Sequence, residues 1–201
     1  MRILFTVVLL AGSFVFVSGA EIKGKIYFDR DTATVTFKVP LSLFGREPVL
    51  HNLRSKIVYF NAKGQRKVLR AKDAREINFT YENETIRMVS KPHPNSLNKK
   101  RPRYYFLKLE EEGSPLNLYI FYDETTSDDG MNSVHTDYVE RYFIEKNKKE
   151  LIPVSGLSFR KKILEIVGDC PEVARKIESR EWRKRDLKEI VAFYNRSCKS
   201  G

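Results

Sequence analysis

Hydrophobic and polar residues alternate with a period of two along most of the chain, from residue 21 to about residue 154. The pattern is clearest at residues 33–39, where alanine, valine and phenylalanine alternate with threonine and lysine. Such alternation is typical of a strand with one buried face. We expect eight to ten short strands, at residues 24–28, 33–39, 56–60, 66–70, 77–81, 85–89, 104–109, 116–122, 138–145 and 150–154.

Residues that favour turns separate these segments and join them into hairpins. Gly64 closes the short polar stretch 61–64, where a tight hairpin needs a residue with positive φ. Residues 71–76 are expected to form one helical turn or a polar bend, and residues 91–102 and 123–137 are predicted to be polar loops. Short consecutive strands of this kind predict a twisted antiparallel sheet, a barrel or a sandwich.

The period changes to that of a helix near residue 155. Apolar residues three and four positions apart predict three short helices, with apolar faces formed by Phe159, Ile163, Ile166 and Val167, then Val173, Ala174 and Ile177, and finally Leu187, Ile190, Val191 and Tyr194. Ser158 and Asp169 are expected to cap the first two helices. Helices this short must pack against the sheet, so we predict an α+β protein with a β-rich domain at residues 21–154 and a helical segment at residues 155–201.

Residues 1–20 have the pattern of a secretory signal peptide. Arg2 supplies a positive charge, an apolar run covers residues 3–17, and residues 18–20 have the small side chains that a signal peptidase requires. The run is short for a membrane span, so we expect cleavage after Ala20 and export to the periplasm, the outer envelope or the medium. Retention as an N-terminal anchor is the alternative.

The composition is that of a soluble globular protein, because 41% of the residues are hydrophobic and 31% are charged. The net charge is +11, and loss of Arg2 with the leader leaves +10. Such an excess favours anionic partners, namely lipid headgroups, an acidic polymer, nucleic acid or an acidic protein, and does not choose among them. Solubility alone is the alternative interpretation, and a nucleic-acid partner is not expected. No later apolar run is long enough to cross a bilayer.

The chain has two cysteines, Cys170 and Cys198. Export to an oxidising compartment favours a disulfide between them, which would tie the start of the second helix to the end of the third. Two free structural thiols are the alternative. The absence of a Cys-x-x-Cys motif argues against zinc or thioredoxin-like chemistry.

Two stretches resemble a group of exported proteins of Gram-negative bacteria to which no biochemical function is assigned. The first is the hairpin at residues 56–70 with the following residues 72–77, and the second is the tail at residues 168–198 with its Asp169-Cys170-Pro171 and Tyr194-Asn195-x-x-Cys198 signatures. The resemblance covers nearly all of the mature chain and implies an irregular β domain, a short helical segment and a bacterial envelope setting. It transfers no catalytic residue.

Basic residues are concentrated around the predicted helices. Most of them lie opposite the apolar stripes, so a solvated outer face is one interpretation and a cationic patch for headgroups or acidic polymers is the other. The residues of this patch are Arg160, Lys161, Lys162, Arg180, Arg183, Lys184, Arg185 and Lys188.

The predicted hairpin at residues 104–122 is rich in aromatic residues. A regular register places Tyr105, Leu107 and Leu109 on one face, together with Leu116, Leu118 and Ile120. It places Tyr104, Phe106, Tyr119 and Phe121 on the other face. One face must be core. The second is either a stacking or partner surface or a face covered by the helices.

No arrangement of residues specifies catalysis, a metal site or a cofactor. His51, His93 and His135 lie in separate segments, and the acidic residues near residue 128 lack the spacing of a calcium loop. Ser96 and Ser158 each begin an S-x-x-K motif, but the companion S-D-N and K-T-G motifs of serine acyl-enzymes are missing from the sequence. We therefore predict a non-catalytic binding module of the cell envelope. A hydrolase of envelope polymers with a site built from dispersed acids, and a structural accessory protein, are the alternatives.

Overall fold

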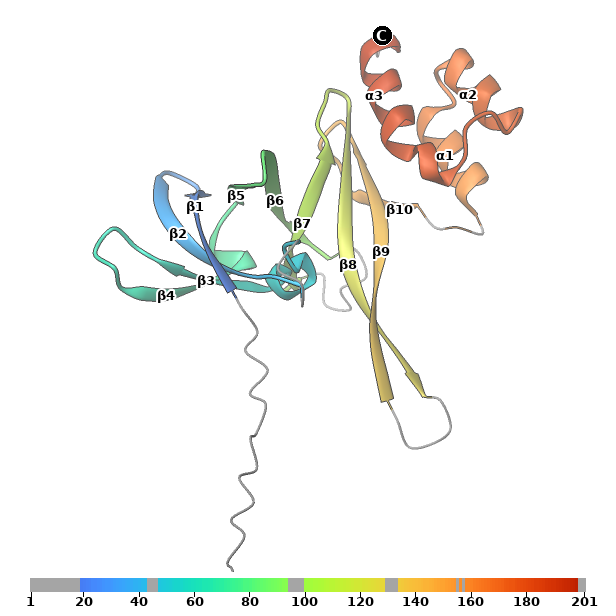
Figure 1. Ribbon diagram of the computed structural model, residues 1–201. Helices are drawn as coiled ribbons and strands as arrows, with labels where there is room; N and C mark the ends of the chain where they lie inside the picture. Colours follow the sequence, from blue (N-terminus) through green and yellow to red (C-terminus); the bar gives the residue numbers. More distant parts are fainter. Residues whose placement is uncertain are drawn as a thin grey trace, which may run out of the picture.

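The computed structural model describes residues 19–42, 47–93, 100–128, 134–154, 156 and 158–198. In this part of the chain, ten strands form one antiparallel sheet, and three helices follow the last strand (Figure 1). This arrangement confirms the predicted α+β class. The sheet is open and not closed into a barrel, and its strand order is β10-β9-β8-β7-β6-β5-β1-β2-β3-β4. Most of the predicted leader, residues 1–18, lies outside the described residues, as does Ser96.

The strands overlap the ten predicted segments, although β1 begins earlier than predicted, at Gly19. They are β1 (Gly19–Tyr27), β2 (Thr32–Pro40), β3 (Lys56–Phe60), β4 (Arg66–Arg70), β5 (Glu76–Tyr81), β6 (Glu84–Pro92), β7 (Tyr104–Glu111), β8 (Leu116–Asp128), β9 (Val134–Lys146) and β10 (Leu151–Val154). The 3-10 turns are η1 (Leu50–Leu53), η2 (Ala71–Asp73) and η3 (Lys184–Asp186), and the helices are α1 (Phe159–Val167), α2 (Pro171–Glu178) and α3 (Leu187–Ser197).

Strands β8 and β9 are longer than the sequence predicts, and they correct the loop expected at residues 123–137. They pair from Leu116 opposite Lys146 to Asp128 opposite Val134. Their far ends project beyond the other strands as a two-stranded ribbon (Figure 1). Backbone hydrogen bonds between the two strands continue along this ribbon, although the sequence there is mostly polar and shows no alternation.

Strands β1 to β6, with η1 and η2, enclose one core, and we call this region the sheet lobe. Phe37 and Phe79 lie at its centre with ring centroids 5.9 Å apart. Leu50 and Leu53 of η1 are buried in the same core. Gly24 permits close approach of strands here, since a Cβ at this position would lie 2.2 Å from the carbonyl oxygen of Asn78. The curved sheet and two 3-10 turns thus close this core without a covering α-helix among the described residues.

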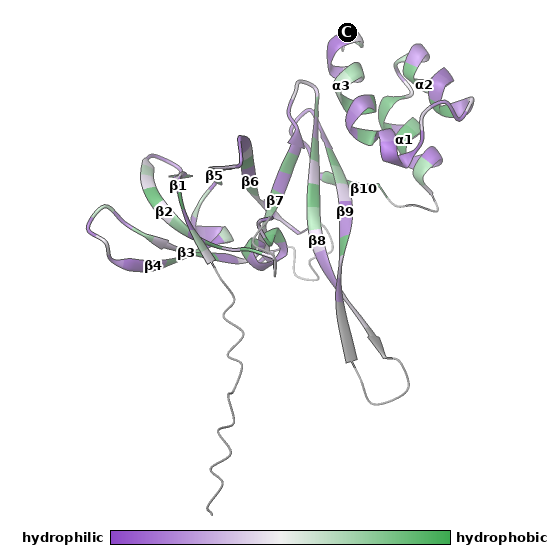
Figure 2. Ribbon diagram, in the orientation of Figure 1, coloured by the Kyte–Doolittle hydropathy of each residue, from purple (hydrophilic) through white to green (hydrophobic). Residues whose placement is uncertain are grey.

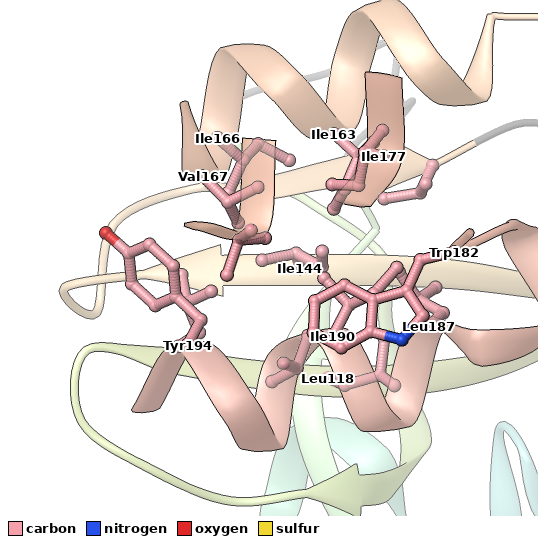
Figure 3. Packing of buried hydrophobic residues seen from close by; sticks show 14 of the residues in the cluster. Leu118, Ile144, Ile163, Ile166, Val167, Ile177, Trp182, Leu187, Ile190 and Tyr194 are labelled. Carbon is pink, nitrogen blue, oxygen red and sulfur yellow. The ribbon is translucent and has the colours of Figure 1, made fainter. Parts of the chain in front are cut away.

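The three helices cover the other end of the sheet, and we call α1 to α3 with β8 to β10 the helical end. Figure 3 shows Leu118 of β8 and Ile144 of β9 pointing toward Ile190 and Trp182, which come from the helices and their connection. All four of these side chains are buried. No helix in the described ranges is both long enough and apolar enough to span a membrane.

The cysteine-containing signature residues anchor the helices. The sulfur atoms of Cys170 and Cys198 lie at disulfide-bonding distance, with their Cα atoms 5.6 Å apart, which confirms the predicted pairing. The side-chain amide of Asn195 donates to the Leu116 carbonyl and accepts from the Leu116 N–H, both at 2.9 Å. This side chain therefore fixes the end of α3 to the start of β8.

Asp169 does not cap α2, contrary to the prediction, because Cys170 occupies the N-cap position. The Asp169 carboxylate instead accepts hydrogen bonds from the Tyr194 hydroxyl at 2.8 Å and from the Lys146 ammonium at 2.7 Å. Burial acts against ionisation, but these two donors outweigh it and lower the pKa of Asp169. Ser158 occupies the predicted N-cap position of α1.

Candidate functional site

A solvent-open cleft of about 750 Å³ lies in the helical end, between the start of α1 and the connection from α2 to α3. Its basic lining residues are Arg160, Lys161, Arg180, Arg183 and Lys184. No aspartate or glutamate lines it within the described part of the chain. In Figure 2, the α2–α3 connection and the outer sides of the helices have the purple colour of hydrophilic residues. We call this hollow the basic cleft.

Apolar side chains form the floor of the basic cleft. Phe159, Leu164, Ile177 and Trp182 line it, and all except Leu164 are buried. Trp182 is the only tryptophan of the chain, and its ring meets that of Phe193 edge-on, with centroids 5.4 Å apart. A cationic rim over an apolar floor suits an anionic group that is attached to an apolar one.

Backbone contacts and one lysine hold the α2–α3 connection in place. Arg180 has a φ of +66°, the left-handed conformation that reverses the chain after a helix. The Trp182 N–H donates to the Lys176 carbonyl at 3.1 Å, and the Lys176 ammonium lies 4.5 Å from the centroid of the Trp182 ring. The Arg183 N–H donates to the Asp186 carboxylate at 2.8 Å. Neither Arg180 nor Arg183 forms an ion pair with a carboxylate of the described residues.

The charges at the start of α1 oppose the preference of a helix. A helix N-terminus carries a partial positive charge that aspartate or glutamate normally balances. The first turn of α1 instead contains Arg160, Lys161 and Lys162 and no acidic residue. Each cation in such a position costs the helix about 0.3–1 kcal/mol. An anion bound in the cleft would offset this repulsion.

The structure brings together five of the eight basic residues that the sequence singled out, and Lys162, Arg185 and Lys188 lie outside the lining. Lys188 donates to Glu110 of β7 at 2.9 Å, and Arg185 lies 3.7 Å from the Asp186 carboxylate. The apolar floor was not predicted, because an apolar stripe marks a buried face but not the side chains that border a hollow. The position of Trp182 between Arg180 and Arg183 is the sequence signal that could have identified it.

The proposed aromatic surface is corrected by the structure. Of Tyr104, Phe106, Tyr119 and Phe121, only Tyr104 is exposed. Phe106 belongs to the core of the sheet lobe, whereas Tyr119 and Phe121 form a small cluster on the opposite face of the sheet. A β-bulge near the end of β7 shifts its register against β8. A shift of one residue exchanges the faces of all side chains beyond it, so the four rings cannot share a face.

Comparisons with family models, with curated proteins and with solved structures found no match. The resemblance to exported Gram-negative proteins therefore stays an expectation. Function must be inferred from the geometry of the site itself.

One carboxylate is buried on the sheet face opposite the helices. Glu145 of β9 accepts hydrogen bonds from Lys91 at 2.5 Å, Asn117 at 3.2 Å and Tyr119 at 3.0 Å. Burial opposes its ionisation, but the three donors outweigh burial and hold the pKa of Glu145 below its usual value. Burial and the nearby Glu145 charge raise the pKa of Tyr119. Because the carboxylate is fully engaged, we interpret it as a structural ion pair.

The described residues contain no group of three or more histidine, cysteine or acidic side chains that could hold a metal ion. His51 stacks on Tyr138 with ring centroids 3.5 Å apart, and His93 meets the ring of Tyr105 edge-on. Burial is the main cause of the lowered pKa of both imidazoles. The side chain of His135 lies outside the described residues. The rings of His51 and His93 contribute packing on separate parts of the sheet.

Proposed function

We propose that the protein is an exported, non-catalytic binding module of the bacterial cell envelope, and that its basic cleft binds an anionic lipid headgroup. The observation that carries this proposal is the set of five cations around an apolar floor, with no carboxylate in the described lining. Arginine guanidinium groups match phosphate oxygens in pairs of parallel hydrogen bonds. The apolar floor favours a lipid over a fully polar polymer, because the region next to a headgroup is apolar.

The expected strength of binding follows from the charge. A lysine or arginine near an anionic membrane contributes about 1 kcal/mol, and this attraction falls off within a Debye length. That length shrinks from about 10 Å at 0.1 M salt to about 3 Å at 1 M salt. Binding through the basic cleft should therefore weaken steeply as salt is added.

The test uses Trp182 as a probe, since the only tryptophan lines the cleft. Its fluorescence is followed while vesicles of phosphatidylglycerol and phosphatidylcholine, or of phosphatidylcholine alone, are added. A variant with Arg160→Gln, Lys161→Gln and Lys184→Gln loses three charges, and its affinity for the anionic vesicles should fall about 100-fold. The matched control carries Lys23→Gln, Lys25→Gln and Lys38→Gln, which remove three exposed charges from β1 and β2.

The proposal fails if neutral and anionic vesicles bind equally, or if the cleft variant and the control variant lose the same affinity. The second result would mean that net charge alone attracts the protein. If the protein binds neither kind of vesicle but does bind an acidic protein, its partner is a protein and not a lipid.

Export is tested on the protein isolated from its own cells. The mature chain should begin at Glu21, and Cys170 and Cys198 should resist alkylation until a reductant is added. A chain that still begins at Met1, with both thiols alkylated at once, would place the protein in a reducing compartment.

A serine hydrolase is the second candidate, and one observation favours it. Ser158 and Lys161, the first and last residues of an S-x-x-K motif, both line the basic cleft. Covalent labelling by a fluorophosphonate or a β-lactam, abolished by Ser158→Ala, would support this enzyme. Unchanged vesicle binding and no labelling would support the binding module.

A further inference from the structure

A second group of cations lies on the sheet lobe. Two adjoining hollows, of about 410 Å³ and 640 Å³, share Lys72 and Tyr104 in their linings. The smaller one is bordered by the start of β3, the end of β4 and residues 102–105, and the larger one by η2 and the end of β6. We call these two adjoining hollows together the Tyr104 groove.

Basic residues are concentrated in the smaller hollow. Its basic lining residues are Lys56, Arg70, Lys72 and Arg103, and no carboxylate lines it in the described ranges. Lys56, Arg70 and Lys72 are exposed and form no ion pair with a described carboxylate. The larger hollow contains Asp29 and Asp73 among its cations. An anionic ligand should therefore bind most strongly at the β3–β4 side.

Lys56 and Arg70 occupy directly opposite positions on the antiparallel strands β3 and β4. Like charges directly opposite on neighbouring strands are destabilising. Each residue is exposed, so neither is retained for core packing. Two neighbouring, exposed cations can bind one external anion together, which would offset their mutual repulsion.

Tyr104 supplies an exposed ring between these charges. It is 41% exposed and lines both hollows. The other aromatic residue of the lining, Tyr105, has its ring edge-on to those of His93 and Phe121, so it is not available in the same way. The groove thus offers one ring face rather than a row of them.

The walls of the groove are held by hydrogen bonds between elements. The Ala71 N–H of η2 donates to the Ser55 carbonyl at 3.0 Å, and the Ser90 hydroxyl of β6 donates to the Ala71 carbonyl at 2.5 Å. The Phe106 N–H of β7 donates to the Arg54 carbonyl at 2.7 Å. These bonds fix the cations and the tyrosine relative to one another before any ligand binds.

We propose that the Tyr104 groove binds an acidic polysaccharide. Sulfate or carboxylate groups of the chain pair with Lys56, Arg70 and Lys72, and one sugar ring packs its C–H bonds on the negative face of the Tyr104 ring. Two adjoining hollows can hold successive units of a linear polymer. Single-stranded nucleic acid normally stacks successive bases on several rings, whereas one exposed ring is present here. The proposal does not depend on the basic cleft.

The test is made in full-length protein that carries the three cleft substitutions described above, so that the cleft cannot contribute. Binding of a short dextran sulfate, of uncharged dextran and of an oligothymidylate of equal charge is measured by isothermal titration. Adding Lys56→Gln and Lys72→Gln should lower dextran sulfate affinity about tenfold for each cation. Tyr104→Ala should also lower it, and Tyr104→Phe should retain it. The charge-matched control adds Lys23→Gln and Lys25→Gln on β1.

Three results would overturn the proposal. The groove and control variants could bind dextran sulfate equally, which would indicate a response to net charge alone. Tyr104→Ala could leave the affinity unchanged, which would remove the sugar contact. Finally, oligothymidylate could bind more tightly than dextran sulfate with the same dependence on Tyr104, which would make the groove a nucleic-acid site.

Discussion

The sheet lobe and the helical end bury their cores by different means. In the sheet lobe, curvature of the strands and two 3-10 turns close the core around Phe37 and Phe79. In the helical end, three short helices cover β8 and β9 and are fastened by the Cys170–Cys198 bond and by Asn195. The first region depends on strand pairing, including that of β1 with β5, whereas the second depends in addition on a disulfide and on a side-chain contact that fasten its helices.

The two regions are alike in how they expose positive charge. Arg160 and Lys161 oppose the dipole of α1, and Lys56 and Arg70 oppose each other across two strands. Both arrangements contradict a local rule for stability. Natural proteins break such rules mainly at functional sites, so this shared feature supports the proposal that each surface binds an anion.

The largest effect should come from removing the fastening of the helical end. Replacing both cysteines by serine should lower the free energy of unfolding by about 3–4 kcal/mol, because the open chain has more entropy when unfolded. Cys170 precedes α2 and Cys198 follows α3, so the loss should fall on the helical end. Denaturant unfolding followed by Trp182 fluorescence should therefore precede the loss of the sheet signal in circular dichroism.

Reduction of the wild-type protein serves as a control for the serine side chains and should reproduce both transitions. If the two probes still change together and at the wild-type denaturant concentration, the bond does not stabilise the helical end. The contrast between the two regions would then lose its main support.

A smaller effect is expected at the ion pair that joins the regions. Lys91 belongs to β6 of the sheet lobe, and Glu145 belongs to β9 beneath the helices. Glu145→Gln should cost about 1–3 kcal/mol at neutral pH, because it weakens hydrogen bonds to a buried group. The loss should appear equally by fluorescence and by circular dichroism, since the contact links both regions.

The pH dependence follows from the lowered pKa of Glu145 in the folded protein. Its stabilisation is complete above the unfolded carboxyl pKa of about 4.3 and is lost as the pH falls through the folded value. The wild-type protein should thus lose more stability than Glu145→Gln in acid. Glu150→Gln, at an exposed carboxylate between β9 and β10, is the control and should keep the wild-type profile. Parallel profiles for all three proteins would exclude this role of Glu145.

The regular elements were predictable because their residues obey local rules. Residues 56–60 and 66–70 form β3 and β4 with the predicted bounds, since they flank a turn with Gly64 at a φ of +72°. The ribbon of β8 and β9 was missed because the sequence at its ends is polar and does not alternate. The aromatic face was wrong because one bulge reversed the register. Asp169 was wrongly assigned as a cap because Tyr194 and Lys146, distant in sequence, compete for its carboxylate.

The basic cleft was predictable only in part, for a similar reason. Charge density around the helices is visible in the sequence, but the hollow depends on where the reversal at Arg180 places Trp182 relative to Phe159. No spacing rule relates residues of α1 to the α2–α3 connection. The Tyr104 groove likewise joins β3, β4, η2 and the start of β7, which meet only in the folded sheet.

The smallest expected effect separates a binding role of the cations from a structural one. Arg160→Gln with Lys161→Gln should raise the stability of the helical end by about 0.3–1 kcal/mol for each charge, since it relieves repulsion with the helix dipole. Lys56→Gln should raise that of the sheet lobe by about 0.2–1 kcal/mol. Thermal unfolding at low ionic strength measures both gains, and added salt should reduce them.

Each of these gains should accompany a loss of binding, to anionic vesicles for the α1 pair and to dextran sulfate for Lys56. Arg175 is an exposed cation in the last turn of α2, where a positive charge interacts favourably with the helix dipole. Arg175→Gln is therefore the matched control, and it should lower the stability of the helical end slightly. If instead the α1 pair and Lys56 behave like Arg175, with lower stability and unchanged binding, their charges support the fold. The argument for two anionic sites would then fall, because it depends on charges kept at a cost to local stability.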